Sequence, residues 1–352
     1  MDGFDDGRGD DAGAAVVLSS PEELIASVAP MLGFTPEAGS VVLVCGETAD
    51  GTPGPVARVD AHGLLGLSPS GPEADVDVGG AVDEGSARGM AAFCAREGVR
   101  EVHLIVVHEG CADDPVAERE AVDAADVFDY WLGLAGTVVR GAYGVGEFAR
   151  GARWVDLGGM AGGTQADPDA CELAAVYAFG GRVRAADRAE IEELYRARDA
   201  DARDADPQPR GRPRARRGRG LARAVAAHDE AARAAAGTGD PDDGTLAEVG
   251  ESLRDVAVRD AVFGRLAQAP LTEEDGRRRL WWAIARRRPD PERSVALMLL
   301  GAAAYFAGSG VHARAALDAA VAADPHNGLA PLLLQGLDHG IRPDRIRGVS
   351  VA

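Results

Sequence analysis

The sequence contains no lysine, and this absence restricts the possible functions. All 37 basic residues among the 352 are arginines. A lysine Schiff base and a Walker-type phosphate loop both require the lysine amine, so both are excluded. Asparagine is nearly absent too, since Asn327 is the only one. Because both residues have AT-rich codons, their scarcity indicates a very GC-rich genome.

Cysteines and long apolar segments are also scarce. The four cysteines are scattered, at Cys45, Cys94, Cys111 and Cys171. They form no Cys-x-x-Cys pair, which argues against a disulfide framework or a zinc ribbon. The longest apolar run, residues 295–307, has 13 residues, whereas a membrane span needs about 17. It therefore predicts a buried helix. The acidic residues 1–11 lack the apolar core of a signal peptide, so we expect a cytoplasmic protein that does not bind membranes.

The net charge of −20 makes the chain strongly acidic. Such a charge keeps a protein soluble and repels nucleic acid and anionic membranes. Residues 199–220 differ, because they are rich in Asp, Pro, Gly and Arg. Six arginines there have no acid between them: Arg210, Arg212, Arg214, Arg216, Arg217 and Arg219. No aromatic residue lies among them, so a solvated linker is favoured over a nucleic-acid site.

The chain divides into four predicted segments. Residues 1–15 are rich in Asp and Gly and are expected to be disordered. Residues 16–198 predict an α/β domain with trailing helices, residues 199–220 a linker, and residues 221–347 a helical domain. The fold class is thus a mixed α/β sheet domain followed by an all-α domain. A helix should begin at Ser20-Pro21, where Ser20 is a suitable N-cap and Pro21 fits the first helical position.

Periodicity and turn residues place the elements within these segments. Strands are predicted at residues 40–45, 55–60, 101–108, 137–143 and 153–157. Helices are predicted in the α/β domain at residues 86–97, 116–134, 169–179 and 186–197. In the helical domain the 3.6-residue period is clearest at residues 246–266, 273–286 and 311–322.

Residues 297–325 resemble one helical hairpin of the tetratricopeptide kind. Counting back from Pro325 over the roughly 34-residue repeat places Leu300 and Gly301 at the Leu-Gly pair of its first helix. The packing positions of its second helix fall on Ala313, Leu317 and Ala320. Neighbouring periods match poorly, so we expect a single repeat that packs on the rest of its domain. Such hairpins usually present a binding surface rather than a reaction centre.

Polar side chains gather where two predicted strands end. Asp60 and His62 follow one strand, and His108, Glu109 and Asp113 follow another. In open α/β sheets, ligands bind beyond the carboxyl ends of strands. Asp60, His62, His108 and Glu109 are therefore candidates for acid–base catalysis, and Asp60, His62, His108 and Asp113 for a divalent metal. An ordinary acidic loop is the favoured interpretation, because no metal-ligand spacing is present.

Two further patterns in the α/β domain favour structural roles. Arg58 and Asp60 are two residues apart on one strand, so they share a face and should form an ion pair. Residues 144–149 read Gly-Val-Gly-Glu-Phe-Ala, close to a dinucleotide-binding fingerprint. No clear helix follows them, so a glycine-rich turn between strands is favoured. We expect no cofactor.

Aromatic residues in the helical domain are candidates for binding a partner. Trp281 and Trp282 are adjacent on one predicted helix, so their side chains point about 100° apart and one of them should be core. Tyr305 and His312 lie on the predicted hairpin. These four residues are the candidates for a protein-binding surface.

Nearly the whole chain resembles an actinobacterial family of domains of unknown function, number 4192. The matching residues are 19–24, 32–36, 40–42, 58–60, 259–262, 281–282, 307–310, 313–317 and 323–330. That family has no established activity, so the resemblance implies a lineage, a fold and a cytoplasmic setting.

The sequence favours a non-enzymatic interaction or regulatory module, with the helical domain binding another protein. A hydrolase at the strand ends, possibly metal-dependent, is the alternative. Nucleic-acid binding through the arginine cluster is a weaker one. The oligomeric state stays open.

Overall fold

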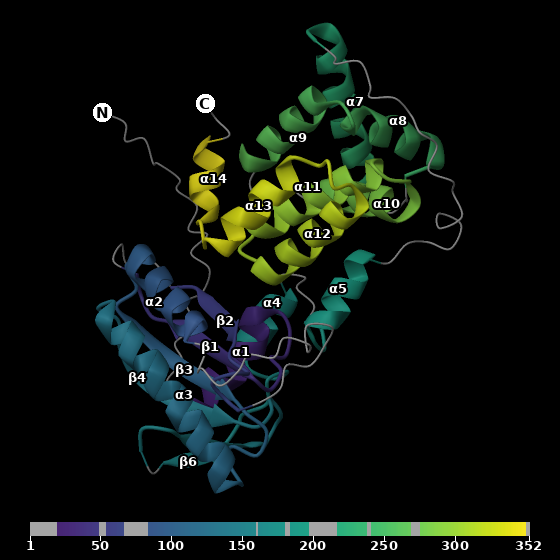
Figure 1. Cartoon of the computed structure of the whole chain (residues 1–352). Coiled ribbons are helices and arrows are strands. Elements are labelled where there is room, and N and C mark those ends of the chain that lie inside the picture. Colours follow the sequence, from purple (N-terminus) through teal and green to yellow (C-terminus); the bar gives the residue numbers. More distant parts are fainter. Residues whose placement is uncertain are drawn as a thin grey trace, which may run out of the picture. The chain divides into compact units, whose positions relative to one another are not determined.

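The computed structural model describes residues 20–48, 54–66, 84–159, 161–179, 184–196, 217–237, 241–268 and 275–349. The chain forms two compact units, which meet in the sequence between Arg184 and Ala185 (Figure 1). The segment predicted to be disordered and most of the arginine-rich segment lie outside the described residues.

The first unit is built on a six-stranded mixed sheet. In sheet order the strands are β2 (Val56–Asp60), β1 (Ser40–Cys45), β3 (Glu101–Val107), β4 (Val138–Val145), β5 (Arg153–Asp156) and β6 (Gly162–Thr164). Only β3 and β4 pair in parallel, and the other neighbours are antiparallel. The mixed α/β class predicted for this half is therefore confirmed.

Helices cover both faces of the sheet. Residues of α1 (Pro21–Leu32) share one core with Val42, Ile105 and Val107. Residues of α2 (Gly85–Glu97) and α3 (Pro115–Leu134) share the other core with Val41, Leu43 and Leu104. Since β1 is covered on both sides, all six of its residues are buried, which explains its unbroken apolar sequence.

Local signals set the boundaries of several elements. The Ser20 side chain accepts a hydrogen bond from the Glu23 amide at 3.3 Å and caps α1, as predicted. Residues 144–149 lead from the end of β4 toward β5, which runs back antiparallel to it with Tyr143 opposite Asp156. No helix follows them in this described stretch, so the glycine-rich turn is confirmed.

The helix α5 (Arg188–Arg196) belongs to the second unit. The sequence placed residues up to 198 with the α/β domain, because the change in composition comes only at residue 199. Packing sets the boundary earlier: α5 lies against α12 of the helical unit, whereas α4 (Glu172–Phe179) remains in the first unit.

The described part of the second unit is mostly helical. Besides α5 it contains α7 (Arg219–Ala235), α8 (Asp243–Leu253), α9 (Val256–Gln268), α10 (Asp275–Arg287), α11 (Glu292–Phe306), α12 (Gly310–Ala323), α13 (Leu329–Asp338) and α14 (Pro343–Val349). The single helix predicted over residues 246–266 was wrong. The chain turns at Arg254 and Asp255, and the Asp255 carboxylate starts α9 by accepting from the Ala257 amide at 3.0 Å.

Two helices are present within residues 297–325, as predicted: α11 and α12 are joined by a short turn and pack on each other. Ala313, Leu317 and Ala320, all on α12, are fully buried. Helix α11, which carries the longest apolar run, is buried along nearly its whole length. Within the described residues, no helix has the length and apolar character needed to cross a membrane.

Candidate functional site

The polar groups at the strand ends have separate partners. The Asp60 carboxylate pairs with the Arg58 guanidinium at 2.7 Å, which confirms the predicted ion pair. Arg58 also donates to the Ser40 hydroxyl at 2.9 Å, so this pair ties β2 to β1. The His62 ring lies over Gly39, where a Cβ atom would be only 2.4 Å from its Cδ2 atom.

His108 is buried and joins the end of β3 to α3. Its Nδ1 atom donates to the Glu109 carbonyl at 2.7 Å, because a carbonyl oxygen can only accept. Its Nε2 atom lies 3.0 Å from a carboxylate oxygen of Glu120 on α3. Both ring nitrogens are therefore used in holding the loop after β3 against the helix.

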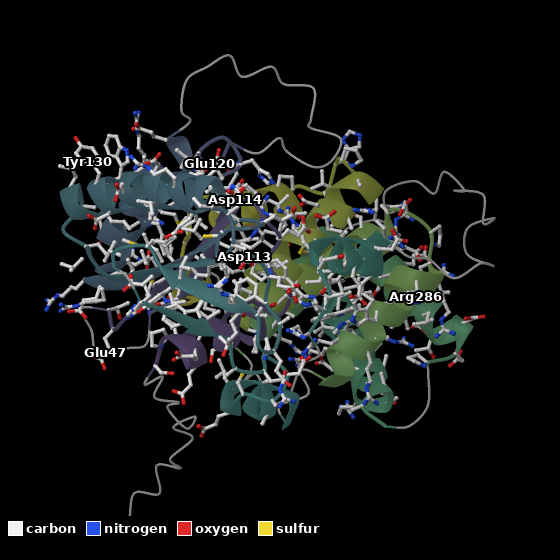
Figure 2. The ribbon with its side chains drawn as sticks, turned by 90° about the horizontal axis from the view of Figure 1, so that it is seen from below. Glu47, Asp113, Asp114, Glu120, Tyr130 and Arg286 are labelled. Carbon is white, nitrogen blue, oxygen red and sulfur yellow. The ribbon has the colours of Figure 1, made fainter. Side chains whose placement is uncertain are left out.

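Asp113 and Asp114, which follow in the same loop, have other partners. Figure 2 shows Asp113 and Asp114 in the loop before α3 and Glu120 on the helix. Asp113 pairs with Arg153 of β5 at 2.6 Å, and Asp114 caps α3 by accepting from the Val116 amide at 3.0 Å. Within the described residues, no group of three or more His, Cys, Asp or Glu side chains could hold a metal ion. The four metal candidates, Asp60, His62, His108 and Asp113, therefore do not come together as such a group.

Two of the four partner-binding candidates belong to the core of the helical unit. Trp281 is fully buried and donates from Nε1 to Nε2 of His228 at 3.0 Å. Tyr305 is buried and donates its hydroxyl to the Ile341 carbonyl at 2.6 Å. Neither side chain is exposed in this fold. Trp281 is the core member of the tryptophan pair.

The other two candidates, Trp282 and His312, meet at one aromatic cluster around Tyr195. The Tyr195 ring stacks on Trp282 of α10, with centroids 4.9 Å apart and planes at 20°. It meets the His312 ring of α12 edge-on at 5.9 Å, and its hydroxyl lies 3.2 Å from Nδ1 of His312. Tyr195 comes from α5, so this cluster is where α5 packs against α10 and α12.

The cluster is largely withdrawn from water. Burial raises the pKa of Tyr195 to about 12, although the nearby Arg278 acts in the opposite direction. Burial, followed by the charge of Arg278, lowers the pKa of His312. Both shifts favour the neutral forms at neutral pH. A neutral hydroxyl and a neutral imidazole can share one hydrogen bond without an uncompensated buried charge.

Arg293 of α11 holds the C-terminal end of α5. Its Nη2 atom donates to the carbonyls of Tyr195 at 2.8 Å and Arg196 at 3.1 Å. Its Nη1 atom donates to the Ala285 carbonyl of α10 at 2.8 Å. The last carbonyls of a helix lack partners within the helix and carry its negative dipole end. A buried guanidinium therefore recognises the end of α5 without regard to its side chains.

Sequence reasoning did not identify Tyr195 and Arg293. A signal for the first was present: Ile191 and Tyr195 are one helical turn apart and are the two buried residues of α5, while Leu194 points outward with 43% exposed. Arg293 had no comparable signal, since it follows a proline-rich turn and resembles the other arginines around it.

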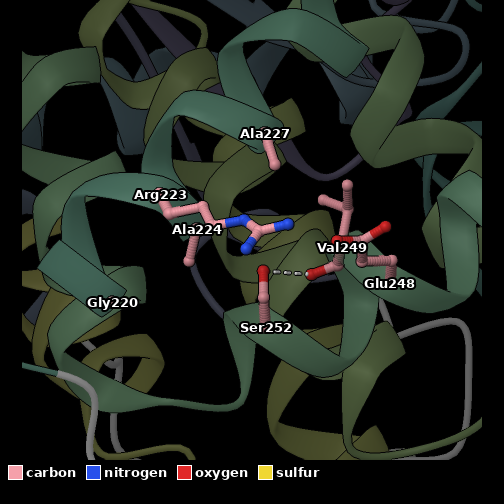
Figure 3. A pocket seen from close by; sticks show the side chains of 7 residues that line it. All are labelled: Gly220, Arg223, Ala224, Ala227, Glu248, Val249 and Ser252. Atoms are coloured by element: carbon pink, nitrogen blue, oxygen red, sulfur yellow. Dashed lines mark hydrogen bonds between the residues drawn. The ribbon is translucent and has the colours of Figure 1, made fainter.

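A small depression of about 140 Å³ lies between α7 and α8 (Figure 3). Arg223 and Glu248 supply its charges, and the Ser252 hydroxyl within it donates to the Val249 carbonyl at 2.8 Å. None of the residues singled out from the sequence lines this depression. It therefore adds nothing to the candidates above.

A family model matches residues 21–344, and the family is described as a domain of unknown function (DUF4192). No curated protein and no solved structure matches the chain.

Proposed function

We propose that the helical unit is a non-enzymatic interaction module that binds an amphipathic helix. The chain belongs to the DUF4192 family, whose description assigns no activity. One observation carries the proposal: a helix, α5, already occupies a surface made by α10, α11 and α12. The proposal includes a tetratricopeptide-like role for the α11–α12 hairpin and a cytoplasmic setting.

The contacts of α5 define the ligand that this surface accepts. Apolar side chains at positions i and i+4, as in Ile191 and Tyr195, are buried against the unit. An aromatic second residue stacks on Trp282. A helix that ends directly after this aromatic residue presents its carbonyls to Arg293. The proposed partner is thus a short amphipathic helix with an aliphatic and an aromatic anchor.

The same contacts imply that α5 and the partner compete. Because α5 is covalently attached, its effective concentration at the surface exceeds the concentration of a free peptide, and for linked modules it reaches the order of millimolar. A free helix of equal affinity would displace little of it. Binding of the partner therefore requires either tighter contacts than those of α5 or a signal that loosens α5.

A labelled peptide of residues 185–198 tests the surface in the full-length chain. We expect the Tyr195→Ala chain to bind this wild-type peptide at least about tenfold more tightly than the wild-type chain does, because its own helix has lost the aromatic anchor. Fluorescence anisotropy measures the affinity. Adding Trp282→Ala to the Tyr195→Ala chain should abolish binding.

Matched peptides provide the control. The peptide with Leu194→Ala keeps both anchors and should bind as the wild-type peptide does, whereas the peptide with Tyr195→Ala should not bind. Circular dichroism verifies that the variant chains remain folded. Equal binding of the wild-type peptide to the wild-type and Tyr195→Ala chains would overturn the proposal.

Arg293→Met should loosen α5 selectively. The change removes hydrogen bonds from a buried cation to helix-end carbonyls, and hydrogen bonds to charged groups contribute about 1.5–3 kcal/mol each. Opening of α5 should become easier by about 2 kcal/mol, so its amides should exchange about 30-fold faster. Hydrogen–deuterium exchange resolved over residues 188–196 measures this. Arg223→Met, at an exposed arginine of α7, should leave the exchange of α5 unchanged.

A further inference from the structure

His312 of α12 faces the hydroxyl of the aromatic anchor on α5. Its Nδ1 atom lies 3.2 Å from the hydroxyl oxygen of Tyr195, which is within hydrogen-bonding distance. The two rings meet edge-on, with their centroids 5.9 Å apart and their planes at 75°. The anchor position therefore offers a polar contact in addition to the apolar packing of the ring.

The surroundings of this contact are poor in water. Tyr195 is only 6% exposed, and Trp282 stacks on its ring. His312 is itself partly buried. Burial is the main reason why the pKa of Tyr195 rises to about 12 and why the pKa of His312 falls. Water therefore cannot readily replace the hydroxyl as the partner of the imidazole.

A hydroxyl suits the imidazole of His312 in either of its neutral tautomers. If Nδ1 carries no proton it accepts from the hydroxyl, and if Nδ1 is protonated it donates to the hydroxyl oxygen. The edge of a phenylalanine ring offers neither a comparable donor nor an acceptor. Phenylalanine would fill the same apolar space and leave Nδ1 without this partner.

We propose that His312 makes this surface selective for tyrosine, so that the partner helix carries tyrosine rather than phenylalanine as its aromatic anchor. The inference rests on the proposed function, because the surface must first accept a free helix. A site that hydrogen-bonds a hydroxyl strongly rejects the analogue that lacks it, since a buried polar group is then left unpaired. The partner is thus a helix with an aliphatic residue followed four positions later by tyrosine, close to the end of the helix.

Two peptides of residues 185–198, the wild-type sequence and its Tyr195→Phe variant, test this selection. They differ by one oxygen atom, and both keep the ring that stacks on Trp282. The full-length Tyr195→Ala chain is the receptor, because its own helix has lost the anchor. We expect the tyrosine peptide to bind about 10- to 100-fold more tightly, since the phenylalanine peptide leaves a buried imidazole nitrogen unpaired. Fluorescence anisotropy measures both affinities.

Variants of His312 assign the selection to this side chain. In the Tyr195→Ala/His312→Leu receptor an apolar side chain replaces the imidazole, so the affinities of the two peptides should lie within about twofold of each other. In the Tyr195→Ala/His312→Gln receptor the amide still offers a donor and an acceptor, so a preference for tyrosine should remain. Circular dichroism verifies that both receptors are folded.

The outcomes separate this inference from the proposed function. If neither peptide binds the Tyr195→Ala receptor, the surface does not accept a helix, and the proposed function fails together with this inference. If both peptides bind with equal affinity, the proposed function stands and selection by His312 is overturned. An undiminished preference for tyrosine in the His312→Leu receptor would overturn it as well. The first comparison uses a single receptor, so it does not depend on the folding of the His312 variants.

Discussion

Gly301→Ala should lower the free energy of unfolding of the helical unit by about 2–3 kcal/mol. A Cβ atom at position 301 would lie 2.6 Å from the Cγ and 2.9 Å from the Cδ2 atom of Leu317, and 3.2 Å from the Ala313 carbonyl oxygen. Leu317 is fully buried, so its side chain has no space into which to move. Helices α11 and α12 would have to separate. Urea unfolding followed by circular dichroism measures the change.

Gly264→Ala is the matched control for this prediction. Gly264 lies within α9, and a Cβ atom there would have nothing within 4 Å. Alanine is favoured over glycine inside a helix, so this variant should be stabilised by up to about 1 kcal/mol. The same substitution is therefore expected to stabilise the protein at position 264 and to destabilise it at position 301. A loss of similar size at both positions would mean that the close approach at Gly301 does not determine the packing of the hairpin.

A second-site change tests the contact itself. Leu317→Ala alone should cost about 2–5 kcal/mol, since it opens a cavity in the core. In the Gly301→Ala/Leu317→Ala double variant, the new methyl group enters part of that cavity. The stability losses of the two single variants should then sum to more than the loss measured for the double variant. Such non-additivity is the signature of residues in direct contact.

The hairpin could be predicted from the sequence because its signal is local. The spacing of Gly301 and of the alanines and leucine of α12 fixes one face on each helix, and those faces pack on each other. The strand at residues 40–45 was predicted equally well, because a short apolar run flanked by glycine is typical of a buried strand.

Other features could not be predicted from the hydrophobic periodicity of the sequence. The turn at Asp255 was missed, because a buried aspartate cap resembles any polar residue within a helical pattern. Strand β6 was missed, because Gly-Gly-Thr has no apolar alternation. The amphipathic character of α5 was visible, but the sequence could not show that its apolar face packs on α12.

The candidate-site residues differ in the same way, since some depend on local sequence patterns and others on tertiary contacts. The sequence indicated that only one of two adjacent tryptophans would be core, since neighbours on a helix point in different directions, and the structure identifies it as Trp281. It also named Trp282 and His312 separately. Their meeting at Tyr195 depends on three helices that are distant in the sequence, so no local pattern could predict it.

His228 should make the stability of the helical unit depend strongly on pH. It is fully buried on α7, where Nε2 accepts from Trp281 and Nδ1 lies 3.5 Å from the Asp229 carboxylate. Burial, followed by the charges of Arg277 and Arg265, lowers its pKa to about 4 from the ordinary value of 6.5. Asp229 alone would favour the imidazolium form. It is itself paired with Arg265, so burial prevails.

The direction of this pH dependence follows from which state, folded or unfolded, binds the proton of His228 more readily. Below pH 6.5 the unfolded chain protonates His228, whereas the folded chain does so only near pH 4. Stability is therefore complete above about pH 7 and falls as the pH decreases through this window. The full effect is about 3 kcal/mol. Between about pH 7.5 and about pH 5 the loss should reach about 2 kcal/mol.

The His228→Gln variant isolates this contribution from all other titrating groups. Glutamine retains an acceptor for the Trp281 indole but does not titrate, so the pH dependence of its unfolding free energy should be smaller by about 2 kcal/mol over the same interval. Urea unfolding of both proteins at the two pH values gives the difference directly. If the wild-type protein and the variant lose stability in parallel, His228 is not held neutral in the fold. The buried Trp281–His228 contact would then not be the reason why acid weakens the helical unit.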